Sequence, residues 1–325
     1  MPVFYSSLIS SFDFDLGSFM NILLTRLGLF CTTLAYITWG ITPLFYQFLH
    51  EDIQATEIFA LRVVGALPVF AVLFVLTKSE FKVIELLKDK RSFLWLLVST
   101  LCVSTSWYLN TWGVTHGQVL MVSLAFFLIP LISILIGVFY LGERLNRNQV
   151  MAIVFCLSGF AYACLNLDQF PWLTVGIALA FSGYALIKKQ IRIDTLNGLT
   201  IEALLVLPVA LGYLLLLGDQ GRFVQAEWGE GLLLMLIAPV VLLPLGLFSI
   251  GVPRLKSLTL VAVLQYIEPT LYFLIGVFLF GEVVDAERLV TFGLIWIGFL
   301  IFCVDSFRYH RRQRKLVSGK VLSAS

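Results

Sequence analysis

The sequence predicts an all-α integral membrane protein with ten transmembrane helices, arranged as two inverted repeats of five helices each. Three features lead to this fold class: an apolar composition, regularly spaced apolar runs, and an internal repeat. Of the 325 residues, 59% are hydrophobic and 13% are charged, and the mean hydropathy is +0.95. Soluble domains carry about 25% charged residues. This composition therefore indicates a chain that lies in a lipid bilayer.

Apolar runs of membrane-crossing length alternate with charged or Gly/Pro-containing breaks. A helix of about 20 apolar residues crosses the hydrocarbon core of a bilayer. The longest connections are 78–92 and 218–230, and the first is either an amphipathic helix on the membrane surface or a solvated charged loop. The ten predicted spans are 27–47, 57–77, 93–113, 118–140, 149–166, 171–187, 199–217, 231–251, 258–280 and 288–305.

Lysine and arginine residues gather on one side of these spans. With ten spans, nearly all of the 22 basic residues fall on the side that also holds both termini. The exceptions are Arg62, which lies within a span, and Arg222 and Arg288 on the opposite side. Because cytoplasmic loops are enriched in Lys and Arg, both termini are predicted to be cytoplasmic.

An internal repeat relates the two halves of the chain. A shift of 139 residues aligns 122–143 with 261–282, and it superimposes Pro130 on Pro269. Five is an odd number, so the second half is predicted to insert with the opposite orientation. Inverted repeats of this kind recur in secondary transporters.

The repeat divides the chain into four predicted parts. They are an N-terminal extension at 1–21, expected to be disordered, a first five-helix repeat at 22–166, a second repeat at 167–306, and a basic cytoplasmic tail at 307–325.

Apart from residues at the very ends of the spans, three charged side chains lie inside predicted spans, where charges are costly and usually face the interior of a helix bundle. Arg62 either attracts an anionic group of a substrate, snorkels to the surface, or pairs with an acid. Glu202 aligns with Arg62 at an offset of 140 and lies near the start of its span, where the helix dipole favours a structural carboxylate. Glu268 is the deepest charge, and burial favours its neutral form. We predict proton coupling at Glu268, with a buried ion pair or a protonated packing glutamate as the alternative.

Prolines accompany the deepest polar residues. Pro269 has no N–H to donate to the carbonyl of Gln265, which predicts a kink beside Glu268, and Pro130 predicts the same kink in the other half. Interrupted helices at matching positions of two repeats indicate a binding site. Tyr266 is the remaining polar side chain of this stretch.

Two further pairs of residues have the spacing of a shared helix face. Trp107 and Asn110 are three residues apart, as are Tyr36 and Trp39, and each pair either lines a cavity or packs between helices. The residues predicted to bind a substrate are Tyr36, Trp39, Arg62, Trp107, Asn110, Gln265 and Tyr266.

The remaining motifs indicate structural roles. Glu143 and Glu282 each follow a glycine at the end of a span, and we expect them to cap helices or neutralise loops. The five cysteines lie in apolar runs without metal-binding spacing, and no catalytic motif is present, so we expect no enzyme, no cofactor and no metal. A net charge of +2 does not suggest a nucleic-acid partner.

Several stretches together resemble a known group. The motifs are "AYITWGITPLFY", "EIFALR", "SWYLNTWGVTHG", "FFLIPLISILIGVFYLGER", "LPLGLFSIG" and "LQYIEPTLYFLIGVFLFGE". They resemble the RarD branch of EamA-type proteins, in the drug/metabolite transporter superfamily, over about residues 22–310. The resemblance implies ten helices in two inverted EamA repeats and a permease of the bacterial inner membrane. It leaves the substrate open.

The functional hypothesis is transport of a small organic metabolite, expected to be amphipathic, or of a drug-like molecule, across the inner membrane by alternating access, coupled to protons through Glu268. A sensor, scaffold or accessory subunit of the same fold is one alternative, and a passive channel is another. The expected partners are an unidentified small-molecule substrate and the lipid bilayer, with the chain as a monomer or homodimer.

Overall fold

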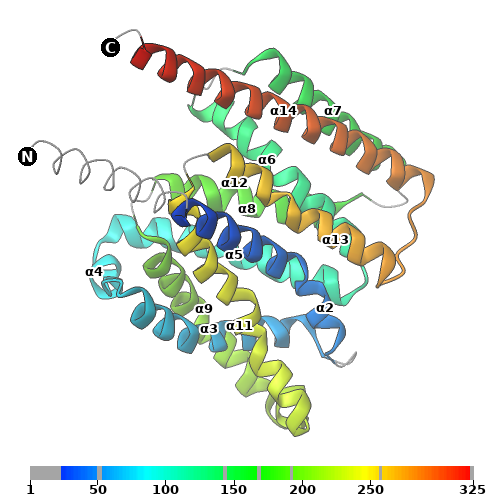
Figure 1. The fold of residues 1–325 in the computed structure, drawn as a ribbon. Helices are drawn as coiled ribbons and strands as arrows, with labels where there is room; N and C mark the ends of the chain where they lie inside the picture. Colours follow the sequence, from blue (N-terminus) through cyan, green and yellow to red (C-terminus); the bar gives the residue numbers. More distant parts are fainter. Residues whose placement is uncertain are drawn as a thin grey trace, which may run out of the picture.

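The computed structural model describes residues 23–49, 53–141, 145–166, 170–190, 193–255 and 258–322, and the regular elements in these ranges are helices (Figure 1). Seven of the described helical stretches are long and apolar enough to cross a membrane. Three shorter apolar helices are Val119–Ile132, Trp172–Lys188 and Val263–Phe278. The chain is a multi-pass, all-helical membrane protein.

The described elements of the first half run in the following order. They are a helix at 23–40, α2 (Thr42–Gln47), α3 (Ala55–Thr77), α4 (Val83–Lys88), α5 (Lys90–Thr115), α6 (Val119–Leu141) and α7 (Arg147–Asn166).

The second half continues with longer and shorter helices. They are α8 (Trp172–Gln190), α9 (Thr195–Leu217), η1 (Gly218–Gln220), α10 (Arg222–Gln225), α11 (Trp228–Gly251), η2 (Val252–Arg254), α12 (Leu258–Gln265), α13 (Ile267–Phe278) and α14 (Ala286–Leu322).

Local sequence sets several helix ends. The side chains of Asp89 and Asp194 accept hydrogen bonds from backbone N–H groups in the first turns of α5 and α9, as N-cap residues do. Gly117 and Gly281 have positive φ angles (63° and 66°) just after α5 and α13, a conformation that glycine adopts without strain.

Some predicted segments differ from the structure or lie outside it. The connection at 78–92 contains the short helix α4, whose Val83 is buried against Leu96 and Ile201. Helix α14 continues to Leu322, through most of the predicted tail. Residues 1–21 and Glu143 lie outside the described residues.

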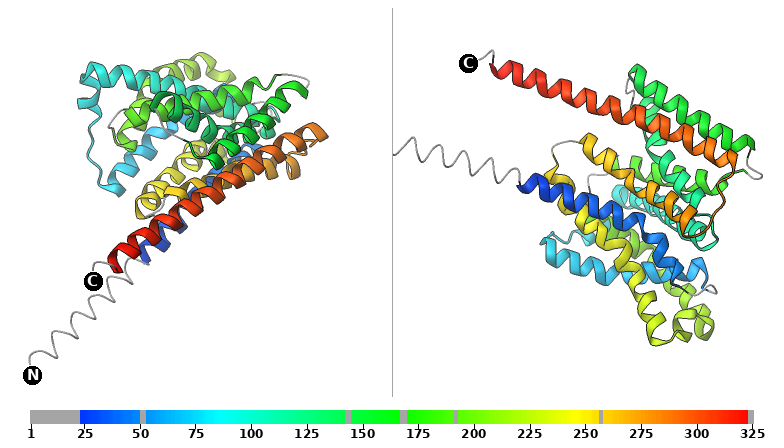
Figure 2. Two further views of the ribbon diagram at one scale, coloured as in Figure 1. Left: turned by 90° about the horizontal axis from the view of Figure 1, so that it is seen from above. Right: turned by 45° about the vertical axis from the view of Figure 1, so that its right-hand side comes forward.

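Helices from the two halves pack against each other. Contacts join α3 to α9, α6 to α13 and α7 to α14, and α5 packs on α8 (Figure 1). Helix α4, the end of α8 with Lys188, and the end of α11 near Arg254 lie at one end of the bundle, which we call the basic end. Helix 23–40 begins and α14 finishes on this same side (Figure 2).

Helices α7 and α14 cross at two glycines. A Cβ atom on Gly298 would lie 2.6 Å from the carbonyl oxygen of Ala152, and one on Gly159 would lie 2.8 Å from the carbonyl oxygen of Thr291. Small residues let membrane helices approach closely in this way. The two contacts are equivalent in the internal repeat. The shift of 139 residues that aligns the two halves takes residue 152 to 291 and residue 159 to 298.

Candidate functional site

A cavity of about 390 Å³, which we call the central cavity, lies among helices of both halves. Its volume is within the usual range for small-molecule sites, and its wall combines apolar surface with a few polar groups. The lining residues are Tyr36, Trp39, Thr42, Tyr46, Arg62, Ser106, Trp107, Asn110, Phe126, Ile129, Phe181, Tyr184, Thr195, Leu199, Val241, Leu242, Leu245, Phe248, Gln265, Glu268, Pro269 and Tyr272.

The central cavity reaches the surface toward the basic end. Thr195, at the start of α9, lines the cavity and is exposed. On the opposite side, the lining residues Thr42 and Tyr46 are buried. Thr195 is the only exposed residue of the described lining, so the access path shown by the described residues lies at the basic end.

Arg62 contributes a buried positive charge to the cavity wall. Its guanidinium carbon lies 4.0 Å from the ring centroid of Trp107, a cation–π arrangement, and only 5% of the residue is exposed. Its Nε has no hydrogen-bond acceptor, and no acid pairs with it, among the described residues. The guanidinium is thus held by an aromatic face and retains donors for a ligand.

Glu268 lines the same cavity at the break between α12 and α13. The helix is interrupted at Tyr266, three residues before Pro269, where the proline ring would clash with the preceding turn. The first helix approaches closely at Gly40, where a Cβ atom would lie 3.3 Å from the Cα of Glu268. No hydrogen bond or ion pair to the Glu268 carboxylate is present within the described ranges, so the alternative of a buried ion pair at Glu268 is not observed there.

Aromatic rings form one wall of the central cavity. The centroids of Tyr36, Trp39 and Phe248 lie 5.7 to 5.8 Å from one another. The indole Nε1 of Trp39 donates to the carbonyl oxygen of Val241 at 2.9 Å, so helix α11 fixes the orientation of this ring. These side chains supply a rigid apolar surface against which a ligand could stack.

Asn110 connects α5 to α13 at the side of the cavity away from the basic end. Its Nδ2 donates to the hydroxyl of Tyr272 at 3.4 Å, and the Tyr272 ring packs edge-on against Phe126. The amide oxygen of Asn110 remains available as an acceptor.

Two of the predicted residues lie elsewhere. Tyr266 packs against Phe299, with ring centroids 3.7 Å apart, and it does not line the central cavity. Pro130 is also outside the lining, and α6 is continuous through it, so the prolines at 130 and 269 have different effects. We therefore leave Tyr266 out of the binding residues proposed below.

The sequence analysis missed several lining residues. Tyr272 follows Glu268 by four residues, so the helical period would have placed both on one face of α13. Phe248, Phe181 and Tyr184 carry no local signal, because only the packing of helices turns them inward.

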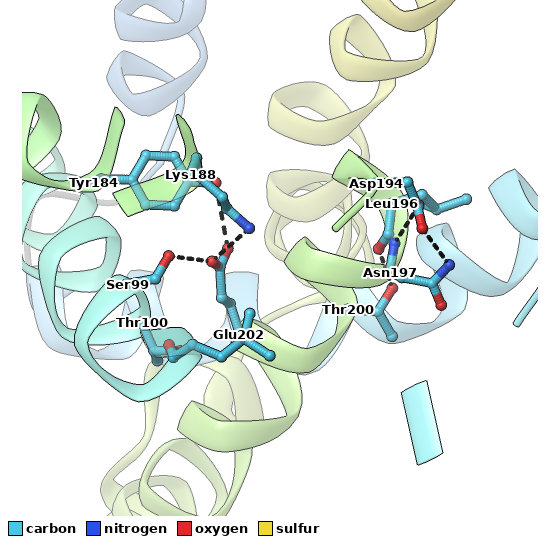
Figure 3. A network of polar contacts seen from close by, with 10 residues as sticks. Ser99, Thr100, Tyr184, Lys188, Asp194, Leu196, Asn197, Thr200 and Glu202 are labelled. Carbon is cyan, nitrogen blue, oxygen red and sulfur yellow. Dashed lines mark hydrogen bonds and ion pairs between the residues drawn. The ribbon is translucent and has the colours of Figure 1, made fainter. Parts of the chain in front are cut away.

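Glu202 is held in a polar network beside the cavity, at the basic end (Figure 3). The Lys188 Nζ lies 2.8 Å from its Oε1, and the Ser99 Oγ donates to the same oxygen at 2.5 Å. The Tyr184 hydroxyl donates to Oε2 at 3.3 Å. The carboxylate thus joins α5, α8 and α9, which fits the structural role predicted for it.

The polar groups of the central cavity are few and of different kinds. Among the described residues, no group of three or more His, Cys, Asp or Glu side chains is arranged to hold a metal ion. The cavity instead offers a guanidinium, a carboxylate without a protein partner, and aromatic walls.

Comparison with known proteins identifies the family. A model of the EamA-like transporter family matches residues 26–164. The uncharacterized transporter YojE of Bacillus subtilis is 32% identical over 294 residues, covering 89% of this chain and 98% of YojE. The chain belongs to the EamA-like transporter family. Among its EamA-like relatives, the protein RarD of Escherichia coli K12 is 32% identical over 293 residues, covering 90% of this chain and 98% of RarD.

Other similarities agree with the RarD-like assignment. A Pseudomonas aeruginosa relative, described as chloramphenicol-sensitive protein RarD, is 30% identical over 274 residues, covering 83% of this chain and 91% of its own. A solved crystal structure matches with a TM-score of 0.53 at 18% identity, covering 86% of this EamA-like chain and 97% of the other. At that identity the match concerns the fold alone.

Proposed function

We propose that this EamA-like protein is a secondary transporter that moves a small organic metabolite across the bacterial inner membrane by alternating access. The observation that carries the proposal is the central cavity, where Arg62 and Glu268 face one space without pairing with each other. Charges inside a membrane bundle usually mark a substrate or ion path. Both termini are proposed to be cytoplasmic, so the cavity would be open to the cytoplasm.

We propose ten transmembrane helices in two inverted repeats as the architecture behind this function. Helix α9 begins and ends 140 residues after α3, and α14 begins 139 residues after α7. These repeat-related helices also contact each other across the bundle. Two halves of opposite orientation offer two near-equivalent conformations, one open to each side of the membrane.

The proposed substrate is amphipathic and carries an anionic group. Arg62 would bind that group through its free donors, while Trp39 and Phe248 would contact the apolar part. Asn110 and Gln265, which also line the cavity, would add polar contacts. Glu268 would carry the coupling proton, because a carboxylate without a protein donor can bind a proton in one conformation and release it in the other.

A binding screen tests the substrate class. Purified protein in detergent would be heated with amino acids, organic acids and nucleosides, since a ligand that binds the folded state raises the melting temperature. We expect at least one anionic compound to stabilise the wild type and to lose this effect in Arg62→Ala. Glu287→Gln, outside the central cavity, is the control that should respond like the wild type. If every stabilising compound acts equally on Arg62→Ala, the proposed role of Arg62 is wrong.

A comparison of substrate exchange with accumulation driven by a pH gradient tests the proton role of Glu268. In proteoliposomes, Glu268→Gln should keep exchange of labelled for unlabelled substrate and lose accumulation driven by a pH gradient. Gradient-driven accumulation with an unchanged pH dependence in this variant would reject proton coupling at Glu268.

A further inference from the structure

A second cavity opens at the end of the bundle opposite the basic end. It has a volume of about 700 Å³, and we call it the vestibule. Its lining residues are Gly117, Gln118, Met121, Asn166, Phe170, Pro171, Trp172, Leu173, Glu282, Val283, Asp285, Glu287 and Arg288. None of these residues lines the central cavity.

The first turns of α6 separate the vestibule from the central cavity. Met121 faces the vestibule, and Phe126 faces the central cavity, along the same helix. Between them, Val122 and Ala125 are fully buried. Movement of α6 at its N-terminal end would therefore open a path between the two spaces.

Glu282 fastens that end of α6 to the other half of the chain. Its Oε1 accepts from the backbone N–H of Val119 at 2.5 Å, and its two oxygens accept from the N–H of Leu120 at 3.3 and 3.2 Å. The first N–H groups of a helix have no partner within the helix, so a carboxylate there is a strong cap. This cap comes from a residue 163 positions along the chain.

The chain after α13 turns so that the Glu282 carboxylate reaches the N-terminus of α6. Gly281 adopts a positive φ of 66°, and the N–H of Glu282 donates to the carbonyl of Gly276 at 2.9 Å, which turns the chain back over the end of α13. Gly276 itself packs against α6, because a Cβ atom there would lie 3.2 Å from the Leu120 side chain. Deeper in the seam, the Ser123 Oγ donates to the carbonyl of Pro269 at 2.8 Å.

We propose that Glu282 is a latch that holds the vestibule end of the central cavity closed by binding the N-terminus of α6. Opening toward the vestibule separates the start of α6 from the end of α13, and the carboxylate must then release the N–H groups of Val119 and Leu120. The proposal deepens the proposed transport function, because it assigns a residue that controls which end of the same cavity is open.

The charged surroundings of Glu282 come from α14 and the loop before it. They are Arg288, Asp285 and Glu287, which also line the vestibule. Burial raises the pKa of Glu282 above its ordinary range, against the lowering effect of the Leu120 and Val119 N–H groups and of Arg288. When the vestibule end of the central cavity is closed, burial is therefore the largest influence on the pKa of Glu282.

The test measures access to the cavity from each face of the membrane, so it needs no substrate. The background carries Cys→Ala at all five native cysteines, and Asn110→Cys serves as the reporter on the cavity wall. A membrane-impermeant maleimide is added to intact cells or to inside-out vesicles. The parent should label rapidly from one face, through the open basic end, and slowly from the other.

We expect Glu282→Ala to raise the labelling rate from the slow face only, by roughly fivefold, the effect of losing one helix cap. Glu287→Gln, a vestibule acid with no hydrogen bond to α6 among the described contacts, should leave both rates unchanged, and Glu282→Gln, whose neutral amide keeps an acceptor oxygen, should leave the slow-face rate close to that of the parent. Amide hydrogen exchange at 119–120 would verify that the cap is lost in a protein that still folds. Faster exchange there with an unchanged slow-face labelling rate would show that Glu282 only stabilises α6, and the latch would be rejected.

This result is independent of the transport mechanism. The maleimide reaches residue 110 by the same route whether or not Glu268→Gln loses proton coupling. The latch and the proposed function can therefore fail separately.

Discussion

Removal of the Glu202 carboxylate should strongly destabilise the basic end of the bundle. Glu202 is only 3% exposed, and its partner Lys188 has a side chain that is 18% exposed, so water replaces little of the lost interaction. Glu202→Ala leaves the Lys188 ammonium without its counter-ion and the Ser99 hydroxyl without its acceptor. Breaking a buried ion pair by removing one partner costs about 3–5 kcal/mol. We take about 3 kcal/mol, because Lys188 keeps some contact with solvent.

Thermal unfolding of the purified protein measures this cost. A loss of this size should lower the melting temperature by roughly 5–10 °C. Glu80→Ala is the matched control, because it breaks the Glu80–Lys82 pair, whose side chains are 78% and 51% exposed. Exposed pairs contribute little, so its melting temperature should match the wild type. If Glu202→Ala melts no lower than Glu80→Ala, the network in Figure 3 does not hold the helices together.

Two further outcomes follow from the packing and the latch. Gly298→Val should place a side chain against the Ala152 carbonyl and lower the free energy of unfolding by about 1–3 kcal/mol. Gly212→Ala is the control, because no atom lies within 4 Å of the added Cβ, and it should not destabilise the protein. Equal melting temperatures of the two variants would contradict the close crossing of α7 and α14. When the vestibule end of the central cavity is closed, burial raises the pKa of Glu282. When that end is open, the solvated carboxyl group has the ordinary pKa of about 4.3. Closing therefore binds a proton, so acidification from about pH 7 to pH 5 should slow labelling of the Asn110→Cys reporter from the slow face. The slow-face labelling rate of Glu282→Gln should not change over the same pH range. Faster labelling of the parent at lower pH would show that opening, and not closing, binds the proton.

The apolar pattern of the sequence was sufficient to place the long helices and the charges inside them. Span 199–217 falls within α9, and Arg62 and Glu268 both face the central cavity. The physical reason is strong in both cases, because lipid selects continuous apolar helices and drives ionised groups toward the interior.

Placements that depend on the rotation of a helix were harder to predict. The sequence analysis grouped Gln265, Tyr266 and Glu268 by adjacency. Tyr266 lies at the interruption between α12 and α13, and its ring packs on Phe299 instead of facing the cavity. The interruption at Tyr266 follows from Pro269, but the continuity of α6 through Pro130 depends on neighbouring helices that no local pattern reveals.

The contact between Glu282 and α6 was beyond local reasoning for a different reason. A glycine followed by glutamate at the end of a span predicts a cap, and the structure contains one. Which helix receives it depends on how the two halves meet, because Val119 is far away along the chain.

The length of α14 has a consequence for measuring motion. Its 37 residues extend about 55 Å at 1.5 Å per residue, whereas the hydrocarbon core of a bilayer is about 30 Å thick. A single stiff rod therefore emerges from the membrane, and any tilt of its embedded part is amplified at its far end. A dye near Leu322, paired with one on an exposed site such as Lys78 before α4, would report rearrangements inside the bilayer from a position in water.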